Sequence, residues 1–391
     1  EQLREAGWEA DSERLHYKRG ARPQKGKTLA IAEWPTDNGP ADYVLFAGLD
    51  ALAVVEAKRK RKDVASAIEQ TKRYSRGFTA SEGAVVPGGP WGKDKYKVPF
   101  LFATNGRPYL KQIAEKSGIW FRDARRDDNH ARALPGWYSP AGLTALLKQD
   151  IEAAHDKLRS EPTDYLGLRD YQIRGIQAVE AAIEAGQPTC LLAMATGTGK
   201  TRTAIGLVYR LLKTKRFRRV LFLVDRTALG EQTNDAFKYH KLENLQTFTQ
   251  IFDLKGLEDI KPDPDTKLHI ATVQGMVKRI LAPSEPGDVP PVDQYDCLVI
   301  DECHRGYGLD REMSEAELTF RDLDDYISKY RRVLDHFDAV KIGLTATPAL
   351  HTTQIFGELR SATRTARRSS TASSSTTSRR SASSPSLASR G

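Results

Sequence analysis

The chain has 391 residues, of which 39% are hydrophobic and 28% charged, and this composition is typical of a globular protein with room for two or three domains. It has no apolar run near the ~20 residues that cross a bilayer and no visible signal peptide, so we expect no membrane association. Three cysteines without metal-ligand spacing favour a reducing, intracellular compartment. Seven of the nine net positive charges are arginines of residues 359–391, so overall charge alone does not predict nucleic-acid binding.

The N-terminal third has the pattern of a small α/β domain. Short β-prone segments separated by loops rich in Pro, Gly and Asp predict a meander or hairpin. These segments are 29–34, 42–46 and 52–58. A helical pattern over 63–76 follows, and 99–104 and 119–121 are predicted as further strands.

Two carboxylates and a lysine form the first chemical constellation. Residues two apart in a strand share a face, so Glu56 and Lys58 project together while Ala57 is expected to point into the core. Asp42 begins the preceding strand and can meet Glu56 across a hairpin. Two carboxylates then hold Mg²⁺, which prefers oxygen ligands and activates water. Lys58 orients or deprotonates that water, or neutralises the scissile phosphate.

The next helix adds two candidate residues to this site. Gln70 and Tyr74 lie four residues apart and therefore on one helical face. An Asp…Glu-x-Lys pattern occurs by chance in many strands, and the basic run 58–62 alone is compatible with a solvated surface. Together with Gln70 and Tyr74, however, the pattern resembles the RecB-like branch of the PD-(D/E)xK nucleases, with Pro40-Ala41-Asp42 in place of a strict Pro-Asp pair. The basic run would then also contact DNA phosphates.

The second half of the chain has the pattern of a parallel sheet. A helix over 143–158 and a linker at 159–163 are predicted to lead into a domain that begins near Leu168. Its predicted strands alternate with helices, which favours a parallel sheet with helices on both faces. These strands are 189–194, 220–225, 268–273, 297–301 and 341–346.

A phosphate-binding turn follows the first of these strands. An apolar strand leads into Met194 and a helical pattern begins after Thr201, so backbone N–H groups and the helix dipole face an anion. Lys200 would reach the outer phosphates of ATP, and Thr201 would hold Mg²⁺. The predicted ATP-binding residues of the turn are Ala195, Thr196, Gly197, Thr198, Gly199, Lys200 and Thr201. Met194 stands where the general pattern has Gly.

Polar residues at the ends of later strands complete this second site. Asp301 would coordinate the nucleotide Mg²⁺, Glu302 would polarise the attacking water, and His304 would relay the nucleotide state. Further along, Thr345, Ala346 and Thr347 are predicted to couple hydrolysis to DNA contact.

A short motif precedes the phosphate-binding turn. Tyr171 can stack on adenine and Gln172 can hydrogen-bond its edge, with Arg169 beside them. By itself, this motif would be interpreted as the start of an ordinary helix.

Taken together, Thr196–Thr201, Asp301–His304 and Thr345–Thr347 resemble superfamily 2 helicase motors, a superfamily whose phosphate-binding turn accommodates Met194. The whole series resembles the restriction (R) subunit of type I restriction–modification enzymes. The segments that carry this resemblance are 103–106, 169–172, 301–307, 328–331, 337–348 and 351–357.

The resemblance implies an ATP- and Mg²⁺-dependent endonuclease of the prokaryotic cytoplasm. Such a subunit joins modification (methyltransferase) and specificity subunits, translocates double-stranded DNA and cuts unmodified DNA. The alternatives are another superfamily 2 helicase–nuclease, of the type III restriction or repair kind, and a non-catalytic assembly fragment.

We therefore predict an α/β fold with two folded domains. Residues 1–140 would form a PD-(D/E)xK nuclease domain, 141–166 a helical linker and 167–357 the first RecA-like, ATP-binding lobe of a motor. The tail 358–391, nearly all Ser, Thr, Ala and Arg, cannot offset its ordering entropy and is predicted to be disordered.

The family would continue at this point into a second lobe that supplies an arginine finger. We therefore expect 358–391 to be non-native sequence and the chain to be a truncated motor with little ATP turnover. Because the chain opens on Glu1 rather than Met, we also expect that residues are missing before it.

Overall fold

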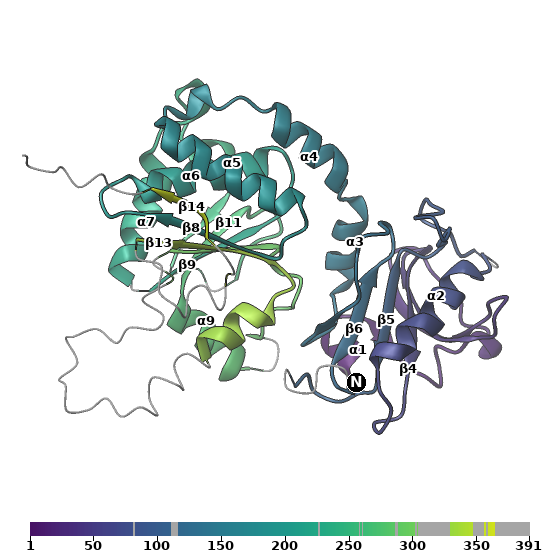
Figure 1. Ribbon diagram of the computed structural model, residues 1–391. Coiled ribbons are helices and arrows are strands. Elements are labelled where there is room, and N and C mark those ends of the chain that lie inside the picture. The colour runs from purple at the N-terminus through teal and green to yellow at the C-terminus, as the bar shows by residue number, and fades with distance from the viewer. Residues whose placement is uncertain are drawn as a thin grey trace, which may run out of the picture.

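The computed structural model describes residues 1–80, 83–110, 116–225, 227–257, 259, 261–285, 288–301, 303, 329–346, 356 and 359–363. Within them the chain forms two seven-stranded sheets, one from each half of the sequence. Figure 1 shows the two sheets side by side, with helices α3 and α4 leading from the first to the second.

The first sheet holds its strands in sequence order. They are β1 (Glu9–Ala10), β2 (Thr28–Trp34), β3 (Ala41–Ala47), β4 (Asp50–Ala57), β5 (Phe100–Thr104), β6 (Ile119–Asp123) and β7 (Arg132–Leu134). Strands β2, β3 and β4 form the predicted antiparallel meander, and β5 then pairs in parallel with β4. A parallel step needs a crossover, which contains helix α2 (Ile68–Arg76).

Both faces of the first sheet are covered by apolar side chains. Successive residues of β4 enter different cores, because side chains alternate between the faces of a strand. Val55 packs in a core with Leu3 of α1 (Gln2–Glu5) and Leu143 of α3. Val54 packs on the other face with Tyr74 of α2. The carboxyl end of β4 is therefore held from both sides.

The second sheet is parallel throughout, in the order β10-β11-β9-β12-β13-β8-β14. Its strands are β8 (Thr189–Met194), β9 (Val220–Val224), β10 (Leu254–Lys255), β11 (Leu268–Thr272), β12 (Cys297–Ile300), β13 (Val340–Thr345) and β14 (Leu359–Thr363). Its helices are α5 (Asp170–Glu184), α6 (Lys200–Lys213), α7 (Thr227–Tyr239), α8 (Phe248–Ile251) and α9 (Val273–Leu281). The five predicted strands are present.

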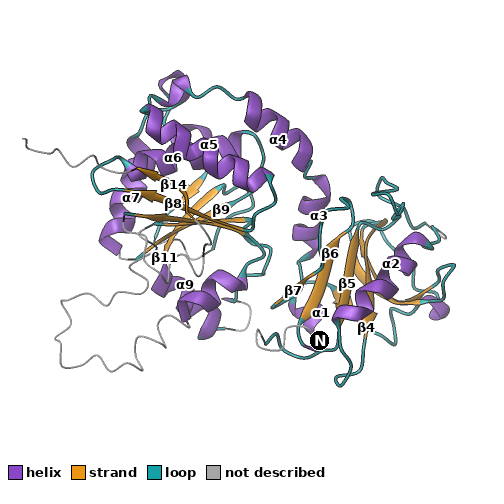
Figure 2. Ribbon diagram, viewed as in Figure 1, coloured by secondary structure: helices purple, strands orange, loops and turns teal. Residues whose placement is uncertain are grey.

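Helices cover both faces of the second sheet, as Figure 2 shows. Leu192 of β8 packs with Leu207 of α6 on one face. Its neighbour Leu191 packs with Met276 of α9 and Tyr330 on the other. The predicted α/β architecture with a parallel, helix-covered sheet is confirmed. None of the described helices is long and apolar enough to cross a membrane.

The single helix predicted over 143–158 is wrong, because the structure has two helices there. They are α3 (Pro140–Lys148) and α4 (Ile151–Ser160). Gln149 is extended, and the side chain of Asp150 accepts the backbone N–H of Ala153 at 3.0 Å, which caps α4. The break separates a helix that packs on the first sheet from one that packs, through Leu158, on the second.

The disorder predicted from residue 358 onward is wrong for five residues. Leu359–Thr363 form β14, which pairs in parallel with the edge strand β8. Backbone hydrogen bonds to an open sheet edge do not require apolar side chains, so a Ser- and Thr-rich segment can pair there. The rest of the tail, 364–391, lies outside the described residues.

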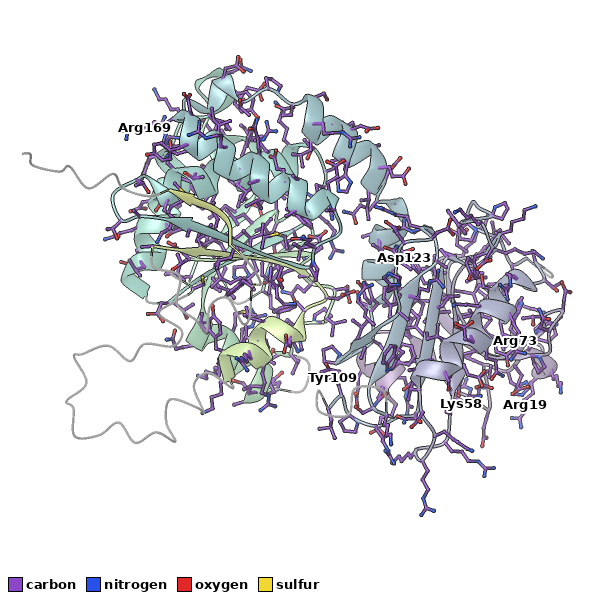
Figure 3. All side chains as sticks on the ribbon, viewed as in Figure 1. Arg19, Lys58, Arg73, Tyr109, Asp123 and Arg169 are labelled. Carbon is purple, nitrogen blue, oxygen red and sulfur yellow. The ribbon has the colours of Figure 1, made fainter. Side chains whose placement is uncertain are left out.

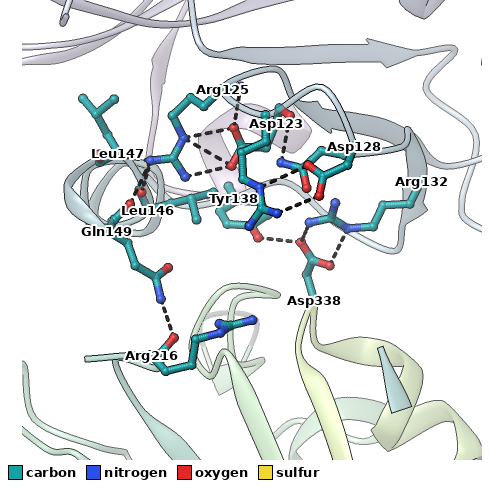
Figure 4. A network of polar contacts seen from close by, with 12 residues as sticks. Asp123, Arg125, Asp128, Arg132, Tyr138, Leu146, Leu147, Gln149, Arg216 and Asp338 are labelled. Carbon is teal, nitrogen blue, oxygen red and sulfur yellow. Dashed lines mark hydrogen bonds and ion pairs between the residues drawn. The ribbon is translucent and has the colours of Figure 1, made fainter. Parts of the chain in front are cut away.

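Polar contacts join the two sheets, and Figure 4 shows several of them. Asp338, just before β13, accepts hydrogen bonds from Arg132 Nε at 2.7 Å and from the Tyr138 hydroxyl at 2.5 Å. Asp293, just before β12, accepts the backbone N–H and the hydroxyl of Ser139, each at 2.7 Å. Two central strands of the second sheet therefore begin at this junction.

Candidate functional site

The two predicted carboxylates lie opposite each other on neighbouring strands. Tyr43 of β3 pairs with Val55 of β4, which places Asp42 across from Glu56. Asp42 Oδ2 accepts the backbone N–H of Ala57 at 2.6 Å. The backbone of β4 thus fixes the Asp42 carboxylate beside the end of that strand.

A chain of hydrogen bonds connects Glu56 to helix α2. Lys58 Nζ donates to Glu56 Oε1 and, at 2.8 Å, to Gln70 Oε1. Gln70 Nε2 in turn donates to the hydroxyl of Tyr74. The structure therefore brings together all five residues predicted for this site, from two strands and one helix.

Burial dominates the electrostatics of Glu56, whose side chain is almost completely covered at 4% exposure. Burial raises the pKa of Glu56, the hydrogen bond from Lys58 partly offsets that rise, and the nearby charge of Asp42 adds to it. Burial likewise raises the pKa of the Tyr74 hydroxyl, while its hydrogen bond with Gln70 lowers it.

One oxygen of Glu56 fits a metal ion. Glu56 Oε2 is buried and has no hydrogen-bond partner among the described residues, a costly state for a carboxylate unless a cation joins it. A hard cation such as Mg²⁺ prefers such an oxygen and often binds through only one or two carboxylates plus water. Within the described part of the chain, no group of three or more Asp, Glu, His or Cys forms a metal-binding cluster.

The expectation for Ala57 is wrong. Its side chain is exposed rather than in the core. Strand β4 ends at this residue, and the following N–H, that of Lys58, donates to Thr104 O of β5 at 2.7 Å. What Ala57 contributes is its backbone N–H to Asp42, and no side-chain pattern in a sequence marks a backbone donor.

The phosphate-binding turn lies between β8 and α6, as predicted. Gly197 and Gly199 have φ of +78° and +79°, in the left-handed region, and α6 begins at Lys200. A Cβ on Gly199 would lie 2.6 Å from Gln172 Nε2. The backbone conformation therefore favours glycine there, and an added Cβ would have to displace the amide of Gln172.

The motif at the start of α5 supports this turn from behind. Gln172 Nε2 donates to Thr198 O and Gly199 O, each at 3.1 Å, and Gln172 Oε1 accepts the N–H of Arg169 at 2.9 Å. The Tyr171 hydroxyl donates to Thr198 O at 2.8 Å. The Gln172 amide bonds to the turn, and its hydrogen bond to an adenine edge stays a prediction.

The carboxyl ends of three parallel strands converge at the turn. Lys200 Nζ lies 3.6 Å from Asp301 Oδ1, at the end of β12. Thr345, at the end of β13, pairs with Ala193 of β8. Ligands of open α/β sheets bind at such an edge. Thr201 and Ala346 lie at the same edge by sequence, whereas Glu302, His304 and Thr347 are outside the described residues.

The two candidate sites are far apart in the molecule. In Figure 3, Lys58 and Arg169 are labelled on opposite sides, the first on the first sheet and the second near α5. The polar contacts of the junction between the sheets offer one route from one site to the other.

Two family models match this chain, one on each sheet. Residues 9–147 match the second domain of the type I restriction enzyme EcoKI endonuclease subunit. Residues 165–350 match the res subunit of type III restriction enzymes.

Curated proteins resemble most of the chain. It is 50% identical over 384 residues to the type I restriction enzyme EcoKI endonuclease subunit of Escherichia coli K12, a match that covers 91% of this chain and 32% of that protein. It is 32% identical to the EcoAI endonuclease subunit of Escherichia coli, over 81% of this chain and 35% of that protein. The chain thus spans about a third of the length of these relatives.

Among solved structures, a fragment of a putative HsdR subunit of a type I restriction enzyme from Vibrio vulnificus YJ016 aligns with 92% of this chain and 56% of that one. The two are 23% identical, with a TM-score of 0.33.

Proposed function

The chain belongs to the family of endonuclease subunits of type I restriction enzymes, and we propose that it contributes the DNA-cutting centre and an ATP-binding lobe to such an enzyme. The substrate is unmodified double-stranded DNA, which the complete enzyme translocates with ATP and cleaves with Mg²⁺. Its partners are the modification and specificity subunits of the same complex, in the cytoplasm of a prokaryote.

The two proposed functions, DNA cleavage and ATP binding, belong to different sheets. The nuclease body comprises the first sheet with α3, and the ATP-binding lobe comprises α4 and the second sheet. We place the boundary at the extended Gln149, between helices that pack on different cores. This boundary lies inside the linker predicted over 141–166.

The buried, unpartnered oxygen of Glu56 carries the nuclease proposal. Asp42 and Glu56 would hold Mg²⁺, which supplies a polarised water and neutralises charge on the phosphate. Lys58, held by Glu56 and Gln70, presents its ammonium group beside that position and stabilises negative charge there. Gln70 and Tyr74 keep Lys58 oriented through their own hydrogen bond.

The second site would bind ATP in the turn 195–199. Lys200 would contact the outer phosphates, and its present neighbour Asp301 would hold the nucleotide Mg²⁺ with Thr201. Arg169, Tyr171 and Gln172 shape the turn from behind. As their motifs predict, Glu302 would polarise the attacking water and His304 would relay the nucleotide state. Residues 345–347 would couple hydrolysis to DNA contact.

Removal of Asp42 tests the nuclease assignment. The unchanged chain, with and without partner subunits, is incubated with double-stranded DNA and Mg²⁺, and cleavage is measured. Asp42→Ala should reduce cleavage by at least about 100-fold, since even residues that only support a metal ligand cost 10- to 100-fold. Asp50→Ala changes a carboxylate at the opposite end of β4 and should cut normally. An Asp42→Ala variant as active as the unchanged chain would show that the site is wrongly assigned.

A further inference from the structure

A basic turn follows directly after the nuclease strand β4. Residues 59–62 (Arg59-Lys60-Arg61-Lys62, hereafter the basic turn) are all exposed. The turn is closed by the N–H of Lys62, which donates to Arg59 O at 2.9 Å. None of its four side chains forms an ion pair within the part of the chain that the structure describes.

Both ends of the basic turn are fixed to the end of the neighbouring strand β5 and the residue that follows it. At the first end, the N–H of Lys58 donates to Thr104 O at 2.7 Å. At the second end, Asn105 Nδ2 donates to Lys62 O at 2.9 Å. Because Glu56 pairs with Ala103, this end of β5 lies beside the nuclease centre.

Asn105 holds the basic turn with one of the three hydrogen bonds of its amide. Its side chain is buried at 3% exposure. Besides Lys62 O, Nδ2 donates to Lys116 O at 2.9 Å, and Oδ1 accepts the N–H of Arg107 at 3.1 Å. A buried amide with all these bonds satisfied holds one arrangement of three chain segments, because losing any partner leaves a polar group unsatisfied.

We propose that the basic turn binds phosphates of the DNA strand being cut, and that Asn105 is the residue that positions it. Four adjacent unpaired cations repel one another, and a row of phosphates relieves this repulsion and releases counterions. A run of charges on a surface is most often only solvated. This run differs because a buried side chain anchors it and because Lys58, its immediate neighbour, belongs to the nuclease centre. The inference rests on the proposed nuclease function.

The test measures DNA binding without cleavage. Affinity of the full chain for a double-stranded DNA is measured by fluorescence anisotropy in EDTA, over a range of salt concentrations. Replacing Arg59, Lys60 and Arg61 together by Ala should reduce the slope of log affinity against log salt by about 0.9 for each phosphate that the turn no longer neutralises, up to about 3 in all. Affinity at low salt should fall in parallel.

A second test asks whether Asn105 affects DNA binding through the basic turn. Asn105→Ala should lower both the affinity and the salt slope, as the triple substitution does. Combined with the triple substitution, it should cause little further decrease, because both changes act on the same phosphate-binding residues. Asn129→Ala is the matched control: Asn129 donates to Asp123 O at 3.1 Å, and Asp123 pairs with Phe100 at the opposite end of β5. This control should retain the slope of the unchanged chain.

Two outcomes overturn the inference. One is a triple variant whose salt slope equals that of the unchanged chain. The other is an Asn105→Ala variant that keeps its far-ultraviolet spectrum and its full salt slope. If Asn105→Ala does not fold, Asn105→Asp replaces it, because that variant keeps the acceptor for the Arg107 N–H while losing both donated bonds. If neither folds, the triple variant decides alone.

These outcomes are separable from failure of the proposed function. Asp42→Ala is scored by cleavage in Mg²⁺, whereas the turn variants are scored by DNA binding in EDTA, where the metal-dependent cleavage does not occur. If Asp42→Ala abolishes cleavage but the turn variants bind DNA like the unchanged chain, only this inference is refuted. If the turn variants lose DNA affinity but Asp42→Ala still cleaves DNA like the unchanged chain, only the nuclease assignment is refuted.

Discussion

Glu56 combines a raised pKa with an unpartnered oxygen. Burial is the main cause of the raised pKa, and Lys58 offsets it only in part. A carboxyl group with a higher pKa in the folded chain binds its proton more tightly when folded. The free energy of unfolding therefore decreases as pH rises from the ordinary pKa of Glu through the raised one. A bound cation would reverse this loss, because it favours the ionised form.

The decrease in the free energy of unfolding with rising pH gives a prediction for the metal-free chain. Melting temperature is measured in EDTA from about pH 4 to pH 8, for the unchanged chain and for Glu56→Gln. The difference between the two curves should show a Glu56 contribution that declines as pH rises above the ordinary value of 4.5. Near neutral pH, Mg²⁺ should raise the melting temperature of the unchanged chain more than that of Glu56→Gln. Parallel pH profiles, or an equal response to Mg²⁺, would contradict the assignment.

At the scale of elements, short continuous apolar runs predicted the strands of the second sheet well. Leu191 and Leu192 show why: each face of a parallel strand is buried, so the apolar run is continuous and easily recognised. Strand-final acids such as Asp301 were placed correctly at the sheet edge because all parallel strands end there. The five residues predicted for the nuclease site also lie close together, since strand and helix periodicities fixed which of them share a face; their catalytic role stays a prediction.

What could not be predicted depends on contacts without a side-chain signature. The helix break at Gln149 follows from packing on two different cores, which no local propensity reveals. Strand β14 forms by backbone pairing to an available edge. Gln172 was placed near the nucleotide, yet its hydrogen bonds to Thr198 O and Gly199 O arise only when the tertiary fold brings α5 against the turn.

The phosphate-binding turn yields a prediction at this scale. Gly199→Ala should weaken binding of a fluorescent ATP analogue, because Ala in the left-handed region costs about 1–2 kcal/mol and its Cβ would displace Gln172. Gly186→Ala is the control, since Gly186 has a similar φ of +75° but no atom within 4 Å of the added Cβ. Both variants should lose stability, whereas only Gly199→Ala should lose nucleotide affinity. Equal affinities in the two variants would show that Gln172 does not shape the turn.

For the whole molecule, the junction and the nucleotide site lie at opposite ends of the same strands. Strand β12 runs from near Asp293 to Asp301, and β13 runs from near Asp338 to Thr345. Val292 also packs into the core of the first sheet. A cavity of about 500 Å³ adjoins the junction and is lined in part by Leu146 and Phe217. Movement of either strand along its axis would therefore reach the nuclease body.

Asp338 is the group best suited to a test of this junction. Burial alone would raise its pKa, but the Arg132 guanidinium and the Tyr138 hydroxyl hold the pKa of Asp338 below its usual value. The stabilisation from this ion pair is thus present above the ordinary Asp pKa and is lost as pH falls through the lowered one. At neutral pH the junction is intact.

Asp338→Asn should therefore uncouple the two bodies at neutral pH. The Arg132 side chain is 44% exposed and that of Asp338 is 11% exposed, so we expect a loss of about 1–3 kcal/mol, as for hydrogen bonds to charged groups, and not the larger cost of a fully buried pair. In calorimetry the unchanged chain should melt in one main transition that an ATP analogue shifts upward. In Asp338→Asn a separate nuclease transition should appear that the analogue no longer shifts. Asp128→Asn removes an exposed ion pair with Arg126 inside the nuclease body and should change neither feature. A nuclease transition that still follows the nucleotide in Asp338→Asn would show that coupling passes elsewhere.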